Sequence, residues 1–206
     1  MITNLNEIIE KEIHAIQQIP ISEAYNQAID LILTQVHHKN GKLVCSGMGK
    51  AGMVASNIAT TFSSTGTPAC FLHPSEAQHG DLGILRENDL MLLISNSGKT
   101  REIIELVGLA RQMIPDIRFI VITSNGESEL AQSSDICLLT GNPPEVCPLG
   151  LTPTTSTTVM TVIGDLLVVE TMKRIGFSVA DYAKRHHGGY LGDVSRKKSD
   201  TITGKR

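Results

Sequence analysis

Two short loops carry residues that could bind an anion. The sequence SNSGKT at positions 95–100 follows an apolar run, and SGMGKAG at positions 46–52 follows another. Ser and Thr hydroxyls donate hydrogen bonds, and glycine lets a ligand approach the backbone. A helix that begins near Thr100 would add amide donors and the positive end of its dipole. Together with Lys50 from the other loop, these groups would suit a small phosphorylated ligand.

Two nucleotide-binding motifs compete with this interpretation. SGMGKAG matches the dinucleotide fingerprint G-x-G-x-x-G after a strand and before a helix. However, the second apolar run ends in Leu72, His73 and Pro74, without the carboxylate that would hold a ribose hydroxyl. GKT at 98–100 resembles the end of a P-loop, but Leu93 stands where its first glycine is required. The P-loop is excluded, and the dinucleotide site is the weaker interpretation of the first loop.

The order of elements predicts a sheet that brings the two loops together. Apolar runs at 43–45, 69–72, 90–94, 119–123 and 136–139 alternate with helical patterns at 51–63, 101–113 and 127–133. Such alternation is typical of βαβ units. In a doubly wound sheet of order 2-1-3-4-5 the first and third strands are neighbours, and ligands bind at their carboxyl ends. The expected fold is α/β, a three-layer doubly wound five-stranded parallel sheet.

Three further helical patterns flank this unit. The first covers about residues 2–19, and the second runs to about His38 with Ser22 as its cap. The third begins with Thr152 as cap and Pro153 in its first turn, and it runs to about Ile175. Its interior, VMTVIGDLLVV, is apolar on nearly every side, which favours contact with another subunit as well as with its own sheet. The expected assembly is a homo-oligomer, a tetramer.

Composition limits the kinds of partner. With 206 residues, 41% of them hydrophobic and 19% charged, the chain fits one domain of an ordinary globular protein, placed at 1–195 with a basic, flexible tail at 196–206. A net charge of −3 gives no reason to expect nucleic acid or a membrane surface as partner. No stretch approaches the ~20 apolar residues of a membrane span. A small-molecule ligand is the expected partner.

The cysteines and histidines give no sign of a metal site. The four cysteines include no C-x-x-C pair, so free thiols in a reducing cytoplasm are expected. His73 and His79 have no further ligand at metal-binding spacing. We therefore predict a cytoplasmic protein without a metal.

Several stretches resemble one known family. ISNSGKT resembles the S-x-S-G-x-T phosphate loop of the sugar isomerase (SIS) domain family. Four others resemble its D-arabinose 5-phosphate isomerase branch: SGMGKAG, TFSSTGTPACFLHPSEAQHGDLG, EVCPLGLTPTTSTT and RHHGGYLG. The resemblance covers about Gly41 to Gly192 and implies a single SIS domain, with a flavodoxin-like fold, that includes the N-terminal helices.

The resemblance also implies a reaction. Such enzymes interconvert D-ribulose 5-phosphate and D-arabinose 5-phosphate through an enediolate, without a cofactor, as the first step toward the acidic sugar Kdo of lipopolysaccharide and capsules. By resemblance the catalytic residues are Lys50, His79, Glu102, Glu145 and His186, with Glu145 as the carbon base and His186 moving protons at oxygen. The resemblance assigns substrate binding to Ser46, Gly47, Gly49, Ser95, Asn96, Ser97, Thr100, Thr155 and Ser156.

The chain departs from the family pattern in two places. The usual His-Pro-Gly-Gly is His186-His187-Gly188-Gly189 here, so either histidine could enter the site. The pair of CBS regulatory modules that follows in many relatives is expected to be missing. A phosphohexulose isomerase, a phosphoheptose isomerase and a non-catalytic sugar-phosphate-binding regulator are the alternatives. Without CBS modules, feedback by CMP-Kdo or Kdo is expected at the active site itself.

Overall fold

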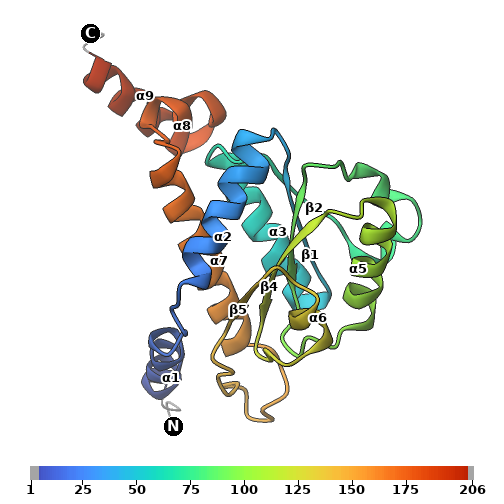
Figure 1. The fold of residues 1–206 in the computed structure, drawn as a ribbon. Helices are drawn as coiled ribbons and strands as arrows, with labels where there is room; N and C mark the ends of the chain where they lie inside the picture. Colours follow the sequence, from blue (N-terminus) through green and yellow to red (C-terminus); the bar gives the residue numbers. More distant parts are fainter. Residues whose placement is uncertain (1–4, 204–206) are drawn as a thin grey trace.

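The sheet has the predicted number and order of strands (Figure 1). The computed structural model describes residues 5–203. Its five strands are all parallel and lie in the order β2-β1-β3-β4-β5. They are β1 Leu43–Gly47, β2 Ala69–Phe71, β3 Leu90–Ile94, β4 Arg118–Thr123 and β5 Ile136–Leu139. The expected order 2-1-3-4-5 is confirmed.

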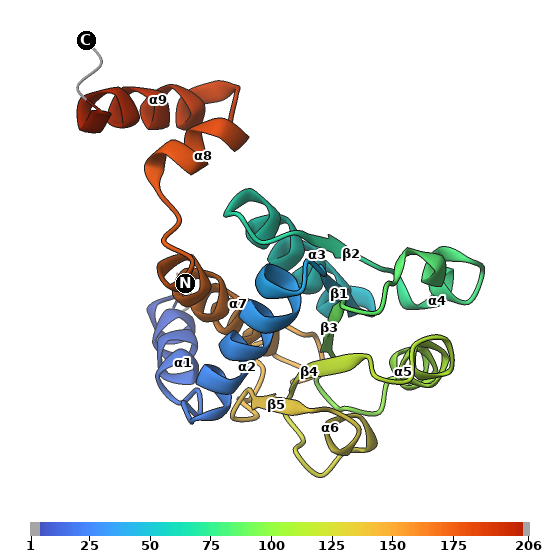
Figure 2. The same cartoon turned by 45° about the horizontal axis from the view of Figure 1, so that its top comes forward.

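Helices cover both faces of the sheet and make three layers (Figure 1, Figure 2). α1, α2, α3 and α7 pack on one face, and α4, α5 and α6 pack on the other. The helical elements are α1 Leu5–Gln17, α2 Ala24–Ile32, η1 Leu33–His38, α3 Gly49–Ser64, α4 Pro74–Ala77, η2 Asp81–Ile84, α5 Arg101–Met113, α6 Glu129–Gln132, α7 Thr155–Arg174, α8 Val179–Arg185 and α9 Gly189–Thr203.

The central strand β3 shows why its sequence does not alternate between apolar and polar residues. All five of its residues are buried. Leu92 packs against the helices of one face and Leu93 against those of the other. A strand with helices on both sides needs apolar side chains at every position. In the neighbouring strand Gly47 pairs with Ile94, so the loops that follow β1 and β3 begin side by side.

Two predicted helix starts are wrong by one or two residues. The residue before α2 is Glu23, and the Ser22 side chain does not cap the helix. α7 begins at Thr155 after Thr154, whereas the sequence favoured Thr152 and Pro153. The later start follows from a distant residue, because the Glu145 carboxylate binds the backbone N–H groups of Thr154 and Ser156.

The C-terminal part is more helical than the sequence analysis predicted. α8 begins with a capping box in which Ser178 and Asp181 bind each other's backbone N–H. Residues 196–203, expected as a flexible tail, continue α9 as regular helix. Residues 2–4 and 204–206, which the predicted first helix and the tail include, lie outside the described part of the chain. Between residues 5 and 203, no helix is both long enough and apolar enough to span a membrane.

Candidate active site

The loop between β3 and α5 is fixed by the strand beside it. The Asn96 carbonyl accepts hydrogen bonds from the Ser124 N–H at 2.9 Å and from the Thr123 hydroxyl at 3.0 Å. The hydroxyls of Ser95 and Thr100 lie 2.7 Å apart and close the loop from within. The side chains of Asn96 and Ser97 are exposed at its tip. The loop therefore presents polar groups at the amino end of α5, where the helix dipole favours an anion.

Gly98 is required by this loop, and its replacement should disrupt it. Its φ is +65°, and a β carbon there would lie 2.0 Å from the Ser128 hydroxyl oxygen. We expect Gly98→Ala to lower the free energy of unfolding by about 1–3 kcal/mol, as strained backbone costs, and to weaken phosphate binding. Urea unfolding and phosphate titration measure both effects. The control is Gly108→Ala in α5, where a β carbon meets nothing within 4 Å. Unchanged stability of Gly98→Ala would contradict the strain.

The loop between β1 and α3 presents Lys50. Gly49 has φ +58° and opens the helix, and the Lys50 side chain that follows is exposed. Ser46 is fully buried, and its hydroxyl donates to the Leu72 carbonyl at 2.6 Å. Of the predicted ligand Ser46 and the predicted catalytic residue Lys50, only Lys50 is exposed to solvent. Ser46 instead stabilises the end of β2.

Glu145 lies at the amino end of α7. Its Oε2 accepts hydrogen bonds from the Thr154 N–H at 2.7 Å, the Thr154 hydroxyl at 2.9 Å and the Ser156 N–H at 3.3 Å. Partial burial raises the pKa of Glu145, but the hydrogen bonds from Ser156 and Thr154 together outweigh it and bring the pKa below its ordinary value. The carboxylate is therefore ionised at neutral pH and can accept a proton.

Thr155 and Ser156 are buried behind Glu145. The Thr155 hydroxyl donates to Glu12 of α1 at 2.8 Å and accepts from the Val146 N–H at 3.1 Å. Both side chains are at most 2% exposed. These two predicted substrate ligands hold the loop that carries Glu145 rather than facing solvent. The contribution of Glu12 was missed, because its sequence position suggests only an amphipathic helix.

Glu102 lies in α5, and His79 lies in the loop after the neighbouring helix α4. Glu102 is half-buried in the first turn of α5. The side chain of Gln78, next to His79, donates a hydrogen bond to Glu105 of α5 at 2.9 Å. Because α4 follows β2 and α5 follows β3, both residues lie at the carboxyl edge of the sheet. Four predicted catalytic residues, Lys50, His79, Glu102 and Glu145, thus share that edge.

His186 is not part of this group within one chain. It ends α8, which lies beyond the far end of α7, away from the β5–α7 loop that carries Glu145 (Figure 1, Figure 2). Its neighbour Arg185 lines a pocket with Ser63 and Ala69, at the opposite end of α3 from Lys50. The His186 ring stacks on Tyr182 at 3.7 Å between centroids. The site of a single chain therefore lacks the predicted fifth catalytic residue, whichever of His186 and His187 fills that role.

Cys147, two residues after Glu145, has an unusual thiol. Its Sγ accepts hydrogen bonds from the N–H groups of Thr152 at 3.2 Å and Leu151 at 3.3 Å. These bonds, that of Thr152 above all, lower the pKa of the thiol to about 7. The sequence predicts four free cysteines, and no motif marks this one as different.

Cys147 should therefore react with alkylating reagents near neutral pH. A thiol with a lowered pKa forms more thiolate, the nucleophilic species. We expect its rate of alkylation by iodoacetamide to rise with pH and to reach half its maximum near pH 7. The buried Cys45, whose pKa is raised by burial, should stay unmodified. Peptide mass spectrometry measures both rates, and a half-maximum near pH 9 would contradict the hydrogen-bonded thiolate.

The surroundings of Glu145 include a cavity but no metal cluster. A cavity of about 840 Å³ lies between α1 and the loop 140–148, and Glu145 and His14 are among its walls. Within residues 5–203, no three His, Cys, Asp or Glu side chains lie close enough together to hold a metal ion. The chemistry available at this edge is that of carboxylates, a lysine, a histidine and hydroxyls.

Comparison with known proteins identifies the family of this chain. Residues 36–170 match the SIS domain family. The chain is 46% identical over 172 residues, 84% of its length, to the arabinose 5-phosphate isomerase KdsD of Yersinia pestis, and the match covers 51% of that protein. The chain thus spans about half the length of this curated relative.

Two solved structures extend the comparison. One is a candidate phosphosugar isomerase involved in capsule formation from Bacteroides fragilis NCTC 9343, with 66% identity and a TM-score of 0.91 over 92% of this chain and 99% of that chain. The other is an E. coli CFT073 protein in complex with arabinose 5-phosphate, with 35% identity and a TM-score of 0.78 over 88% of this chain and 97% of that chain. The family model covers more than half of the chain, and the chain belongs to the SIS domain family.

Proposed function

We propose that this protein is an arabinose 5-phosphate isomerase, which interconverts D-ribulose 5-phosphate and D-arabinose 5-phosphate. The observation that carries the proposal is the position of Glu145. An ionised carboxylate, held by three hydrogen bonds, lies at the same sheet edge as an anion-binding loop and Lys50. The similarity to KdsD and to the structure that holds arabinose 5-phosphate supports the same assignment.

The proposed chemistry needs a base, a proton relay and a phosphate clamp. Glu145 would remove the proton from C2 of the aldose and return it to C1, through an enediolate. A proton must move from the C2 hydroxyl to the C1 oxygen at the same time, a role proposed for His186. Lys50 would stabilise the developing negative oxygen, and the loop 95–100 would hold the phosphate. Glu102 and His79 complete the proposed catalytic group.

An isomerase assay tests the assignment. The purified protein is supplied with D-ribulose 5-phosphate, D-arabinose 5-phosphate or fructose 6-phosphate, and the products are followed by NMR. We expect the two five-carbon phosphates to reach the same equilibrium mixture from either side. In D₂O the product should carry deuterium at the carbon that receives the proton. Turnover of fructose 6-phosphate alone would assign the protein to another branch. Binding of a sugar phosphate without any turnover would make it a sensor.

The assembly is part of the proposal. We infer a homo-oligomer, a tetramer, in which His186 enters the site of a neighbouring subunit. Large apolar side chains are exposed on α1, on α7 and in the loop before α7: Leu5, Ile8, Ile9, Ile13, Leu149, Leu151, Leu166 and Val169. Exposed apolar patches of this kind mark contacts between proteins. A cytoplasmic location fits the four free thiols of the described chain.

CMP-Kdo and Kdo, later products of the proposed Kdo pathway, would compete with the substrate for the same site. CMP-Kdo and Kdo both carry anionic groups that the loop 95–100 and Lys50 could bind. We expect CMP-Kdo to raise the apparent KM without changing kcat, and to raise the unfolding temperature. Titration of CMP-Kdo into the isomerase assay measures the first effect, with CMP as the matched control. An unchanged KM and an unchanged unfolding temperature at millimolar CMP-Kdo would contradict feedback inhibition at this site.

A further inference from the structure

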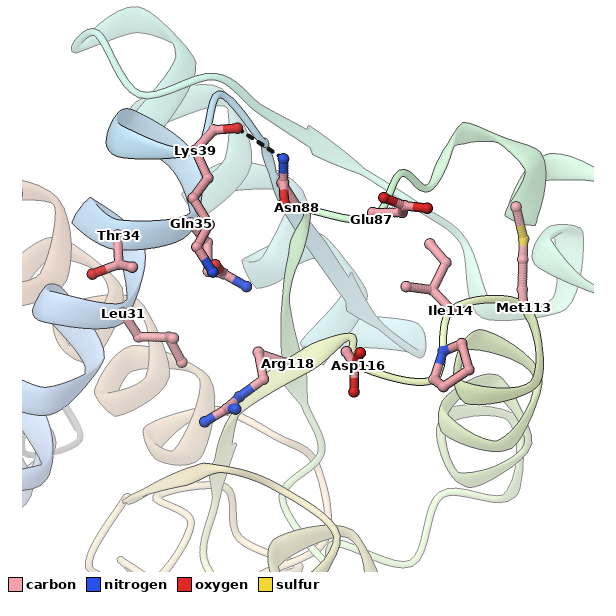
Figure 3. Close-up of a pocket in the computed structure, with 11 residues that line it drawn as sticks. Leu31, Thr34, Gln35, Lys39, Glu87, Asn88, Met113, Ile114, Asp116 and Arg118 are labelled. Atoms are coloured by element: carbon pink, nitrogen blue, oxygen red, sulfur yellow. Dashed lines mark hydrogen bonds between the residues drawn. The ribbon is translucent and has the colours of Figure 1, made fainter.

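A second cavity lies at the amino edge of the sheet, opposite the loop 95–100 (Figure 3). Its volume is about 690 Å³, which is within the range of small-molecule sites. Its walls come from η1 and the end of α2, from the loop before β3, and from the connection between α5 and β4. The proposed isomerase makes no use of these residues.

Gln35, in the wall of this cavity, is a buried polar side chain with an unpaired oxygen. It is 5% exposed, and its Oε1 accepts no hydrogen bond from the described part of the chain. A buried amide oxygen without a donor destabilises the folded chain, and such groups call for an explanation. Gln35 lies in η1, a π-helix in which the Lys39 N–H donates to the Thr34 carbonyl at 3.0 Å. π-helices are rare and are frequently found at functional sites.

The two walls beside Gln35 are fixed to each other. The Gln35 carbonyl accepts from the Gly41 N–H at 2.9 Å, and the Asn88 side chain donates to the Lys39 carbonyl at 3.0 Å. A β carbon at Gly41 would lie 2.0 Å from the Asn88 carbonyl oxygen, so this close approach needs glycine. The backbone of these walls is therefore fixed before a ligand binds.

The charges of the cavity are divided between its two sides. Figure 3 shows Lys39, Gln35 and Arg118 on the side of η1, with Glu87 and Asp116 toward α5. Arg118 is oriented by Asp135, whose Oδ1 lies 2.7 Å from the arginine Nε. Among residues 5–203, no aromatic side chain lines the cavity, so it offers no surface on which a nucleobase would stack.

We propose that this cavity is a second ligand site, for a small hydroxylated anion such as a sugar acid or a sugar phosphate. The anionic group would bind Lys39 and Arg118, and the Gln35 side chain, turned toward the cavity, would accept from a hydroxyl through its Oε1. Glu87 and Asp116 can accept from further hydroxyls on the other side. A simple anion or an uncharged polyol would satisfy only half of the site.

Calorimetric titration with four probes tests this assignment. D-gluconate represents the sugar acid and glycerol 3-phosphate the hydroxylated phosphate, whereas inorganic phosphate and ribitol each carry half of the recognised chemistry. Lys39→Met removes one cation from the cavity, and Lys173→Met removes an exposed lysine of α7 outside it. We expect Lys39→Met to weaken binding about 10- to 100-fold, as the loss of a charge-assisted hydrogen bond does, and Lys173→Met to leave it unchanged.

The probe that binds shows whether the ligand is a sugar acid or a hydroxylated phosphate. Binding that is as tight in Lys39→Met as in the unchanged protein belongs to another site, the carboxyl edge included, and counts against the proposal. No saturable binding of gluconate or glycerol 3-phosphate up to about 10 mM, roughly ten times a Kd of about 1 mM, would overturn it. These results do not depend on whether the protein proves to be an isomerase.

Gln35→Leu separates a ligand-binding role from a structural one. Leucine fills a similar volume and removes the unpaired oxygen, so the unfolding temperature of the free protein should not fall. The rise in that temperature produced by the bound probe should be lost. If Gln35→Leu unfolds at a lower temperature and still responds to the probe, Gln35 is structural and the proposal is wrong.

Discussion

Replacing Glu145 by glutamine should reduce turnover of D-arabinose 5-phosphate by about 10²- to 10⁴-fold, the usual contribution of a general base. Glutamine keeps the size of the side chain and an oxygen that can accept from Thr154, but it cannot take a proton. The free energy of unfolding should fall by only about 1 kcal/mol, as for a weakened helix cap. Steady-state kinetics and urea unfolding measure the two effects separately.

The control for this variant is Glu127→Gln, which makes the same change on an exposed side chain in another loop. It should leave turnover unchanged. If Glu145→Gln keeps full turnover, the base at carbon is a different residue, and Glu102 becomes the first one to test. A large loss of stability in Glu145→Gln would show instead that the carboxylate mainly caps α7.

Mixed oligomers of Lys50→Ala and His186→Ala should recover activity that each variant lacks on its own. Lys50 and His186 lie at opposite ends of the chain's own sheet, so the site that contains both must combine two subunits. In a random mixture, about one quarter of such shared sites would contain both native residues, since each comes from the intact subunit half of the time. Activity of co-refolded subunits, with the assembly followed by light scattering, gives the measurement.

A second mixture provides the control. Lys50 and Glu145 lie at the same sheet edge of one chain, so Lys50→Ala and Glu145→Gln subunits should not complement each other. Recovery in the first mixture alone supports the shared site. If neither mixture recovers activity although the subunits assemble, His186 does not reach a neighbouring site, and His187 is tested in the same way.

The sheet could be predicted from the sequence because its signals are local. Each strand is a short run of apolar residues, and the alternation with helices leaves few possible topologies. The loop 95–100 could also be predicted, since Gly98 and its neighbours form a contiguous motif. The position of Lys50, Glu102 and Glu145 at the carboxyl edge follows directly from the strand order.

The roles of individual side chains depended on contacts that the sequence does not display. Ser46 and Ser97 belong to similar loops, yet one hydroxyl is bound to the Leu72 carbonyl and the other is exposed. Thr155 binds Glu12, which is 143 residues away in sequence. The start of α7 was misplaced for the same reason, because its cap comes from Glu145. Propensity describes a helix end only when its cap is local.

The shortness of the two outer strands has a consequence for how copies of this chain can associate. β2 has three residues and β5 has four, so the sheet offers few free backbone groups to an added strand. At β2 the Ser63 hydroxyl also donates to the Ala69 carbonyl, at 2.6 Å. Edge-to-edge growth of sheets, the usual start of aggregation, is therefore blocked at both ends. Copies of the chain are left to meet through their helical faces, which permit closed assemblies rather than fibres.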